Sequence, residues 1–283
     1  MTILPTDPAP ATAAATVAAT QAPAASSQAA DIALLRRFEP VLRYTRGERF
    51  FPIGVEHYVR ESSLWQQRPG EEPIQLVPEG ELTVDNLAEP READFGTVQF
   101  LKFIEPLNIA ELAAYTVQHQ LGQKNPADVF QAGRGRLARV GYGSRFVAAL
   151  FSITLLARGR VPGDTAAAAA EAYQRMITND PRHIYYGRVM RQAGWVALQY
   201  WFFYPFNNWR SGFFGVNDHE ADWEMIYVYL SESGDGSLTP RWAAFASHDF
   251  VGDDLRRRWD DPELEKVGDH PVVYAGAGSQ SSY

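Results

Sequence analysis

The chain of 283 residues contains no cysteine, which excludes a disulfide scaffold, a zinc site built from thiolates and catalysis by a thiol. Its 26 lysines and arginines are outnumbered by 34 aspartates and glutamates, and the net charge of -8 gives nucleic-acid binding no electrostatic support. No apolar run reaches the roughly 18–20 residues of a membrane-spanning helix. The nearest, Phe146 to Ala157, is flanked by arginines and predicts a buried helix or, alternatively, a helix lying on an anionic membrane surface.

Several enzyme and targeting motifs are also missing. The chain has no GxSxG sequence, and the glycine-rich stretch "GRGRLARVGYG" lacks the Gly-Lys-Ser/Thr ending of a phosphate-binding loop. Residues 1–30 contain no Lys or Arg and are rich in Ala and Pro, so they predict a disordered linker rather than a secretory signal. We therefore expect a cytoplasmic protein, or the soluble part of a longer membrane-associated chain.

The chain beyond the linker predicts a single α+β domain over residues 31–283. From about residue 183, segments rich in β-branched and aromatic residues alternate with loops rich in Gly, Asp and Ser. Without helices between them, these strands should pair antiparallel, so we expect an antiparallel β-sandwich. An α-helical insertion is predicted at about 105–180, with helices at 108–121, 135–158 and 164–178. Four tryptophans are expected to be largely buried in the sandwich: Trp195, Trp201, Trp223 and Trp242.

The stretch "VNDHEADWEMIYVYL" carries the main chemical feature of the sequence. Side chains alternate along a strand, so Asp222 and Glu224 should share a face with Ile226 and the apolar residues beyond it. Two carboxylates at a core edge repel each other and lose hydration, so an arginine, a proton or a divalent cation must offset their charge. His219 lies just before the strand and can reach the same site.

Further polar residues are predicted at the same end of the sheet. Asn207 and Asn208 end the preceding strand, and His248 ends the next strand along the chain. Carboxylate and amide oxygens with an imidazole suit Ca²⁺, Mg²⁺ or Mn²⁺, or else Zn²⁺. A rim cluster that is hydrated or paired with arginine is the alternative interpretation of the same residues.

Five blocks of the sequence resemble, in order, proteins of the vacuolar protein sorting-associated protein 62-like family. The blocks are "FEPVLRYTRGERFFPIGVEHY", "YWFFYPFN", "HEADWE", "ASHD" and "HPVVYAGAGS". The "HxxDWE" core also resembles the heptapeptide of the necrosis- and ethylene-inducing-like proteins, a related β-sandwich group. Residues 60–180 have no counterpart in the plant or fungal members and look like an insertion of bacterial relatives.

The resemblance implies a divalent cation in a cavity at the end of the sandwich, which the necrosis-inducing group uses to bind sugar headgroups of membrane sphingolipids. The matching positions here are His219, Asp222 and Glu224, with Asn207 near the place of a further aspartate ligand. Two departures are the pair Glu220-Ala221, which replaces Arg-His, and Gln280, which stands where relatives carry His.

These observations together predict a binding domain stabilised by a divalent cation, Ca²⁺ or Mg²⁺, for a polar small molecule, a glycan, a lipid headgroup or a phosphate. The residues expected to contact the ligand are His248, Asn208 and Gln280. Because no nucleophile motif is present, the sequence favours binding over catalysis. The alternative is a metal-dependent hydrolase with His248 as general base.

Overall fold

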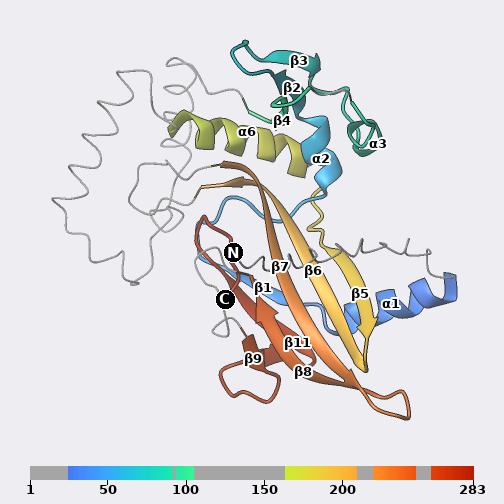
Figure 1. The fold of residues 1–283 in the computed structure, drawn as a ribbon. Coiled ribbons are helices and arrows are strands. Elements are labelled where there is room, and N and C mark those ends of the chain that lie inside the picture. The colour runs from blue at the N-terminus through green and yellow to red at the C-terminus, as the bar shows by residue number, and fades with distance from the viewer. Residues whose placement is uncertain (1–24, 92–93, 105–162, 209–218, 247–255) are drawn as a thin grey trace, which may run out of the picture.

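A five-stranded antiparallel sheet forms the centre of the molecule in the computed structural model, which describes residues 25–91, 94–104, 163–208, 219–246 and 256–283 (Figure 1). Its strand order is β5-β6-β7-β8-β9. The strands are β5 (Tyr186–Gln192), β6 (Trp195–Asn207), β7 (His219–Glu232), β8 (Leu238–Phe245) and β9 (Arg256–Arg258). The long strands β6 and β7 pair along nearly their whole length, from Trp195 opposite Ser231 to Asn207 opposite His219.

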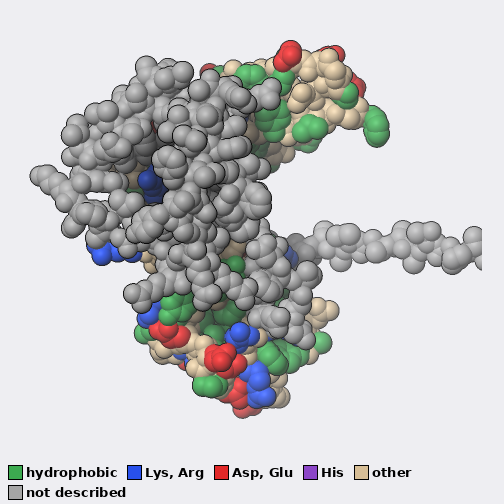
Figure 2. Space-filling view, turned by 90° about the vertical axis from the view of Figure 1, so that its left-hand side faces the viewer, with side chains coloured by type: hydrophobic (Ala, Val, Ile, Leu, Met, Phe, Trp, Pro, Cys, Tyr) green, Lys and Arg blue, Asp and Glu red, His purple; other side chains and the backbone are tan. Residues whose placement is uncertain are grey.

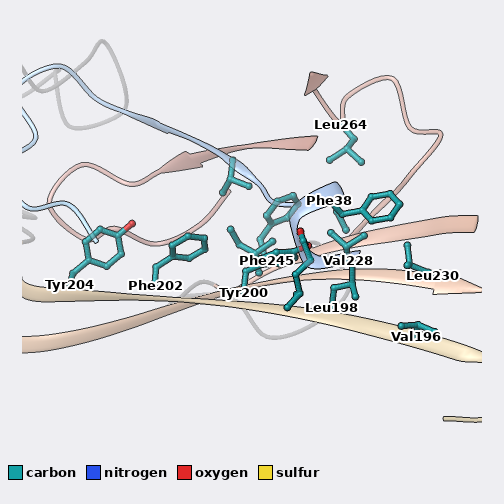
Figure 3. Packing of buried hydrophobic residues seen from close by; sticks show 14 residues of the cluster. Phe38, Val196, Leu198, Tyr200, Phe202, Tyr204, Val228, Leu230, Phe245 and Leu264 are labelled. Carbon is teal, nitrogen blue, oxygen red and sulfur yellow. The ribbon is translucent and has the colours of Figure 1, made fainter. Parts of the chain in front are cut away.

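A second layer packs on one face of this sheet, which we call the inner face. It contains helix α1 (Ala25–Arg37) and the small sheet of β1 (Val41–Tyr44), β11 (His270–Ala275) and β10 (Lys266–Val267), in which β1 runs parallel to β11. Even-numbered residues of β6 and β7 fill the space between the layers, together with Phe38 and Leu264 (Figure 3). Tyr204 lies at one end of this row of side chains (Figure 3).

A third layer covers the other face of the central sheet, the outer face, only at its upper end in Figure 1. It consists of α2 (Val55–Arg60), α6 (Gly163–Asn179) and a three-stranded antiparallel sheet with short helix α3 (Val84–Leu87) beside it. The strands of that sheet are β2 (Ser63–Gln67), β3 (Ile74–Val77) and β4 (Val98–Lys102). In Figure 2 the described residues at the upper end, which are coloured, project to one side of the molecule.

Local sequence explains the main elements. The alanine-rich stretch of α6 propagates a helix, and its residues Ala169, Ala172, Tyr173 and Met176 recur at helical spacing on one buried stripe. The β5–β6 hairpin closes through Ala193 and Gly194, whose φ angles of 50° and 77° suit the twist of a two-residue hairpin turn.

Antiparallel sheets that pack together, with a few helices, confirm the predicted fold class. Helix α6 matches the helix predicted at 164–178, whereas the helices predicted at 108–121 and 135–158 and most of the linker lie outside the described residues. Helix α1 begins at Ala25, within the last residues of the stretch that the sequence predicts as a linker. No helix in the described ranges is long and apolar enough to cross a membrane.

The expected burial of the tryptophans was also wrong for three of the four. Trp195, Trp223 and Trp242 are 43%, 44% and 37% exposed. All three lie on the outer face. The third layer covers only the upper end of that face (Figure 1), which leaves Trp195 and Trp242 uncovered. Trp223 lies at the upper end and contacts the rings of Tyr186, Trp201 and Phe203. The alternating pattern predicted which face they occupy but not how far the covering layer extends.

Candidate functional site

The carboxylates of Asp222 and Glu224 lie on the inner face at the upper end of β7, as the alternating pattern predicts. Asp222 is 4% exposed and Glu224 is 2% exposed. Asp222 is paired with Tyr204 of β6, and Glu224 with Phe202, which are both core residues. The two carboxylates therefore extend the apolar row of Ile226, Val228 and Leu230 into a buried acidic end.

A change of face just before Asp222 separates the pair from its neighbour Glu220. Ala221 has a φ of 56°, and opposite it stands Pro205, which has no N–H to donate to the ladder. This break reverses the alternation, so Phe206 and Glu220 turn to the outer face, where Phe206 joins the core under α6. It also brings Asn207 to the inner face, where its side-chain Nδ2 donates to Asp222 Oδ2 at 2.8 Å.

Burial and mutual repulsion shape the electrostatics of the pair. Desolvation, and then the charge of Asp222, raise the pKa of Glu224 to about 8, although a backbone hydrogen bond from Ser282 opposes the shift. Desolvation also raises the pKa of Tyr204, whose hydroxyl lies 2.9 Å from that of Tyr44. An arginine, a proton or a cation must therefore offset the charge of the pair near neutral pH.

The C-terminal turn after β11 closes the site from one side. Asn208 N donates to Gly278 O at 3.0 Å, and Asn207 Nδ2 also reaches Ser279 O at 3.3 Å. Gly278 N in turn donates to Glu48 Oε2 at 3.0 Å, and Gln280 Nε2 lies 3.5 Å from Glu48 Oε1. The ends of β6 and β11 and the turn after β1 thus meet beside the carboxylate pair.

Two amide oxygens in this turn region have no hydrogen-bond partner among the described residues. They are Asn208 Oδ1 and Gln280 Oε1, both buried as atoms, and Gln280 is only 1% exposed as a residue. A buried acceptor without a donor costs free energy, so such atoms mark places where an ion, a water or a ligand completes the structure. Both residues were predicted to contact a ligand, and their oxygens suit a cation as well.

The structure does not bring all predicted residues together. His219 is exposed, and its Nδ1 lies 3.3 Å from the carbonyl oxygen of Glu220. His248 lies outside the described residues. Within the described ranges, no three His, Cys, Asp or Glu side chains are grouped closely enough to hold a metal ion by themselves. A cation here would depend on amide and backbone oxygens in addition to the carboxylates.

Glu48 is the site residue that sequence reasoning missed. It follows Gly47, which has a φ of 93°, in the turn after β1, and its carboxylate also accepts from the backbone N–H groups of Arg49 and Phe50 at 2.9 and 3.3 Å. The stretch "GERFFP" indicates a turn but contains no sign of the distant partner Gly278. Only the chain path, with β1 beside β11, brings them together.

Replacing Gly278 by alanine should destabilise the protein by about 2–3 kcal/mol, since Gly278 has a φ of 73° and an added Cβ would lie 2.8 Å from Asn208 O. Gly194→Ala is a matched control, because Gly194 has a φ of 77° but open space around it. Chemical denaturation should show a loss of only about 1 kcal/mol for the control. Equal losses of stability would mean that the close approach of Gly278 to Asn208 contributes nothing to the free energy of unfolding.

Comparisons with known proteins add little to this geometry. No model of a protein family matches the chain, and no curated protein matches it. Among solved structures, a weak neighbour from the necrosis- and ethylene-inducing group is described as "Crystal structure of non-toxic HaNLP3 protein". It is 16% identical, the match covers 32% of this chain and 38% of that chain, and the TM-score is 0.26. So limited a likeness carries no argument, and the relationship to the vacuolar protein sorting-associated protein 62-like family stays a prediction.

Proposed function

We propose that the chain is a binding domain in which a divalent cation, Ca²⁺ or Mg²⁺, sits beside Asp222 and Glu224 and holds a polar ligand. The observation that carries the proposal is the burial of both carboxylates on one face of β7, at 4% and 2% exposure. Two anions so close to a core need positive charge, and a hard cation would supply it while using the carboxylate oxygens as ligands.

The surrounding donors fit an oxygen-preferring cation better than zinc. Gln280 Oε1 and Asn208 Oδ1 are acceptors without a described partner, and amide oxygens are ordinary Ca²⁺ ligands. The imidazole that zinc would favour, that of His219, is exposed and points to the carbonyl of Glu220 instead.

We infer the class of ligand from the coordination positions on the cation that the protein's own oxygens would leave open. Ca²⁺ takes 6–8 oxygen ligands. Two carboxylates that each bind through one oxygen, together with Asn208 Oδ1 and Gln280 Oε1, would supply four, so positions would be left for a ligand. Bound there, the cation would neutralise the acidic pair and coordinate hydroxyl or phosphate oxygens. We therefore propose a glycan, a phosphate or a lipid headgroup as ligand, with His248, Asn208 and Gln280 beside it. The "HEADWE" core supports the same interpretation through its resemblance to the heptapeptide of the necrosis- and ethylene-inducing-like proteins, a group that holds a divalent cation.

Addition of Ca²⁺ to protein freed of metal with a chelator should raise the melting temperature, because a ligand of the native state stabilises it by RT ln(1 + [L]/Kd). At a Ca²⁺ concentration 100 times Kd the gain is about 2.7 kcal/mol. Asp222→Asn should abolish the gain, whereas Glu232→Gln, an exposed change at the far end of the same strand, should retain it. A wild type that melts identically with Ca²⁺, Mg²⁺ and chelator would contradict the proposal.

A further inference from the structure

A hollow lies on the outer face of the central sheet, at the end opposite the carboxylate pair. It has a volume of about 790 Å³ and is formed by the β5–β6 hairpin, Tyr229 near the end of β7, Trp242 of β8 and Arg256 of β9. Trp195 in its wall pairs with Ser231, whereas Asp222 pairs with Tyr204 near the other end of β6 and β7. The two places are therefore separate, and the hollow needs no cation.

The wall of this hollow is aromatic and open to solvent. It includes Trp195, Trp242, Tyr229 and Met190, of which Trp195 is 43%, Trp242 37% and Met190 36% exposed. Tyr229 and Trp242 are directly opposite each other on β7 and β8. Figure 2 shows hydrophobic side chains exposed beside charged ones at this lower end of the molecule. Rings gathered in a concave place of this size are typical of a small-molecule site.

The charged groups in the wall are basic. Arg256 lies with its Cζ 5.9 Å from the centre of the Trp242 ring. Burial raises the pKa of Tyr229, and the charge of Arg256 partly opposes that shift. Arg191 also lines the hollow and is held by Asp31 at 2.5 Å. None of the lining residues that the structure describes is acidic, although the whole chain carries a net charge of -8. Both charged residues of the described wall are thus arginines, and the charge of Arg191 is offset by Asp31.

We propose that this hollow binds a small amphipathic anion, a molecule with an apolar body and one carboxylate, sulfate or phosphate group. The apolar body would lie against the rings of Trp195 and Trp242, and the anionic group would reach Arg256. A neutral sugar is disfavoured, because it needs hydrogen-bond partners around its whole ring, and the wall offers chiefly rings, Met190 and alanines. A guanidinium that already lies over an aromatic ring is well placed to bind an anion whose body stacks on that ring.

The test uses the full chain in buffer with a chelator and two fluorescent probes of similar shape. One is 1-anilinonaphthalene-8-sulfonate, an aromatic anion, and the other is N-phenyl-1-naphthylamine, which is neutral. Three variants are compared with wild type: Trp242→Ala, Arg256→Gln and, as a matched control on the same strand, Arg258→Gln. Arg258 is exposed, is bound to Asp260 at 2.8 Å and does not line the hollow. Melting curves of the variants show whether each is folded.

The anionic probe should saturate one site on the wild type and bind about tenfold more weakly to Arg256→Gln, which loses a charged contact. Trp242→Ala should weaken the binding of both probes, and Arg258→Gln should leave the binding of both unchanged. If Arg256→Gln weakens the binding of both probes equally, or of neither, the hollow does not select an anion. If the protein binds vesicles containing anionic lipid but not the dissolved anionic probe, this end of the sheet is a membrane-contact surface and the proposal is overturned.

Discussion

Glu224→Gln should stabilise the chelated protein at pH 8 by about 4 kcal/mol, at about 1.4 kcal/mol for each unit of pKa shift. This large gain for a single substitution in a core follows from the raised pKa of Glu224, about 8 in the folded state. Glutamine keeps the shape of the side chain and has no charge to desolvate next to Asp222. Urea unfolding of both proteins in the presence of a chelator measures the difference.

The sign of the pH dependence of stability is set by the pH at which Glu224 takes up a proton in the folded and in the unfolded state. Below pH 4.5 the carboxyl of Glu224 is protonated in both the folded and the unfolded state and has no effect on stability. Between pH 4.5 and about 8 the unfolded chain releases the proton while the folded chain retains it, so stability falls as pH rises. Above about pH 8 the loss is complete. The gap between Glu224→Gln and wild type should therefore open across this window and then stay constant.

A bound cation should make the wild type more stable than Glu224→Gln, which reverses their order of stability in chelator. If Ca²⁺ binds as proposed, it should stabilise the ionised form of wild-type Glu224, whereas the glutamine variant has lost one of the two carboxylates. Glu232→Gln, exposed at the end of β7, should behave as the wild type does under both conditions. A pH profile that is the same for wild type and Glu224→Gln would mean that the pKa of Glu224 is the same in the folded and unfolded states, which would contradict the prediction.

The position of the acidic pair could be predicted because it depends on the simplest property of a strand. Asp222, Glu224 and Ile226 are spaced by two, and the alternation between them is unbroken. Glu220 is spaced by two from Asp222 as well, yet it points to the opposite face. Alternation fails there because Ala221 adopts a positive φ opposite Pro205, and a positive φ at alanine has no sequence signature.

The rest of the site depends on contacts between residues that are far apart in sequence. Glu48 meets Gly278 and Gln280 only because β1 runs parallel to β11, and a parallel pairing between the two ends of a domain cannot be read from local patterns. The exposure of Trp195 and Trp242 has the same origin, since it depends on where the third layer ends. The sequence therefore predicted which faces and turns exist, and the structure determined which of them meet.

Glu220→Ala should destabilise the protein by about 3–4 kcal/mol, because Glu220 ties β7 to the end of β4 and to α2. Its Oε2 accepts from Phe103 N at 2.7 Å and from the hydroxyl of Tyr58 at 3.2 Å, and its Oε1 accepts from Ile104 N at 3.3 Å. Phe103 and Ile104 are 6% and 5% exposed, so water does not easily replace the lost acceptor. Hydrogen bonds to a charged group contribute about 1.5–3 kcal/mol each, and buried donors left without a partner add to the loss.

Two further variants separate the hydrogen bonds of Glu220 from its bulk and charge. Glu220→Gln keeps the length of the side chain and one acceptor oxygen, so it should lose roughly half as much stability as Glu220→Ala in urea unfolding. Tyr58→Phe removes one donor and leaves both backbone N–H groups bonded to Glu220, so it should cost about 1 kcal/mol. In a double variant, Glu220→Ala should cancel most of the effect of Tyr58→Phe, because the two residues share one contact. Fully additive losses, or a loss below about 1 kcal/mol for Glu220→Ala, would show that Glu220 does not hold these layers together.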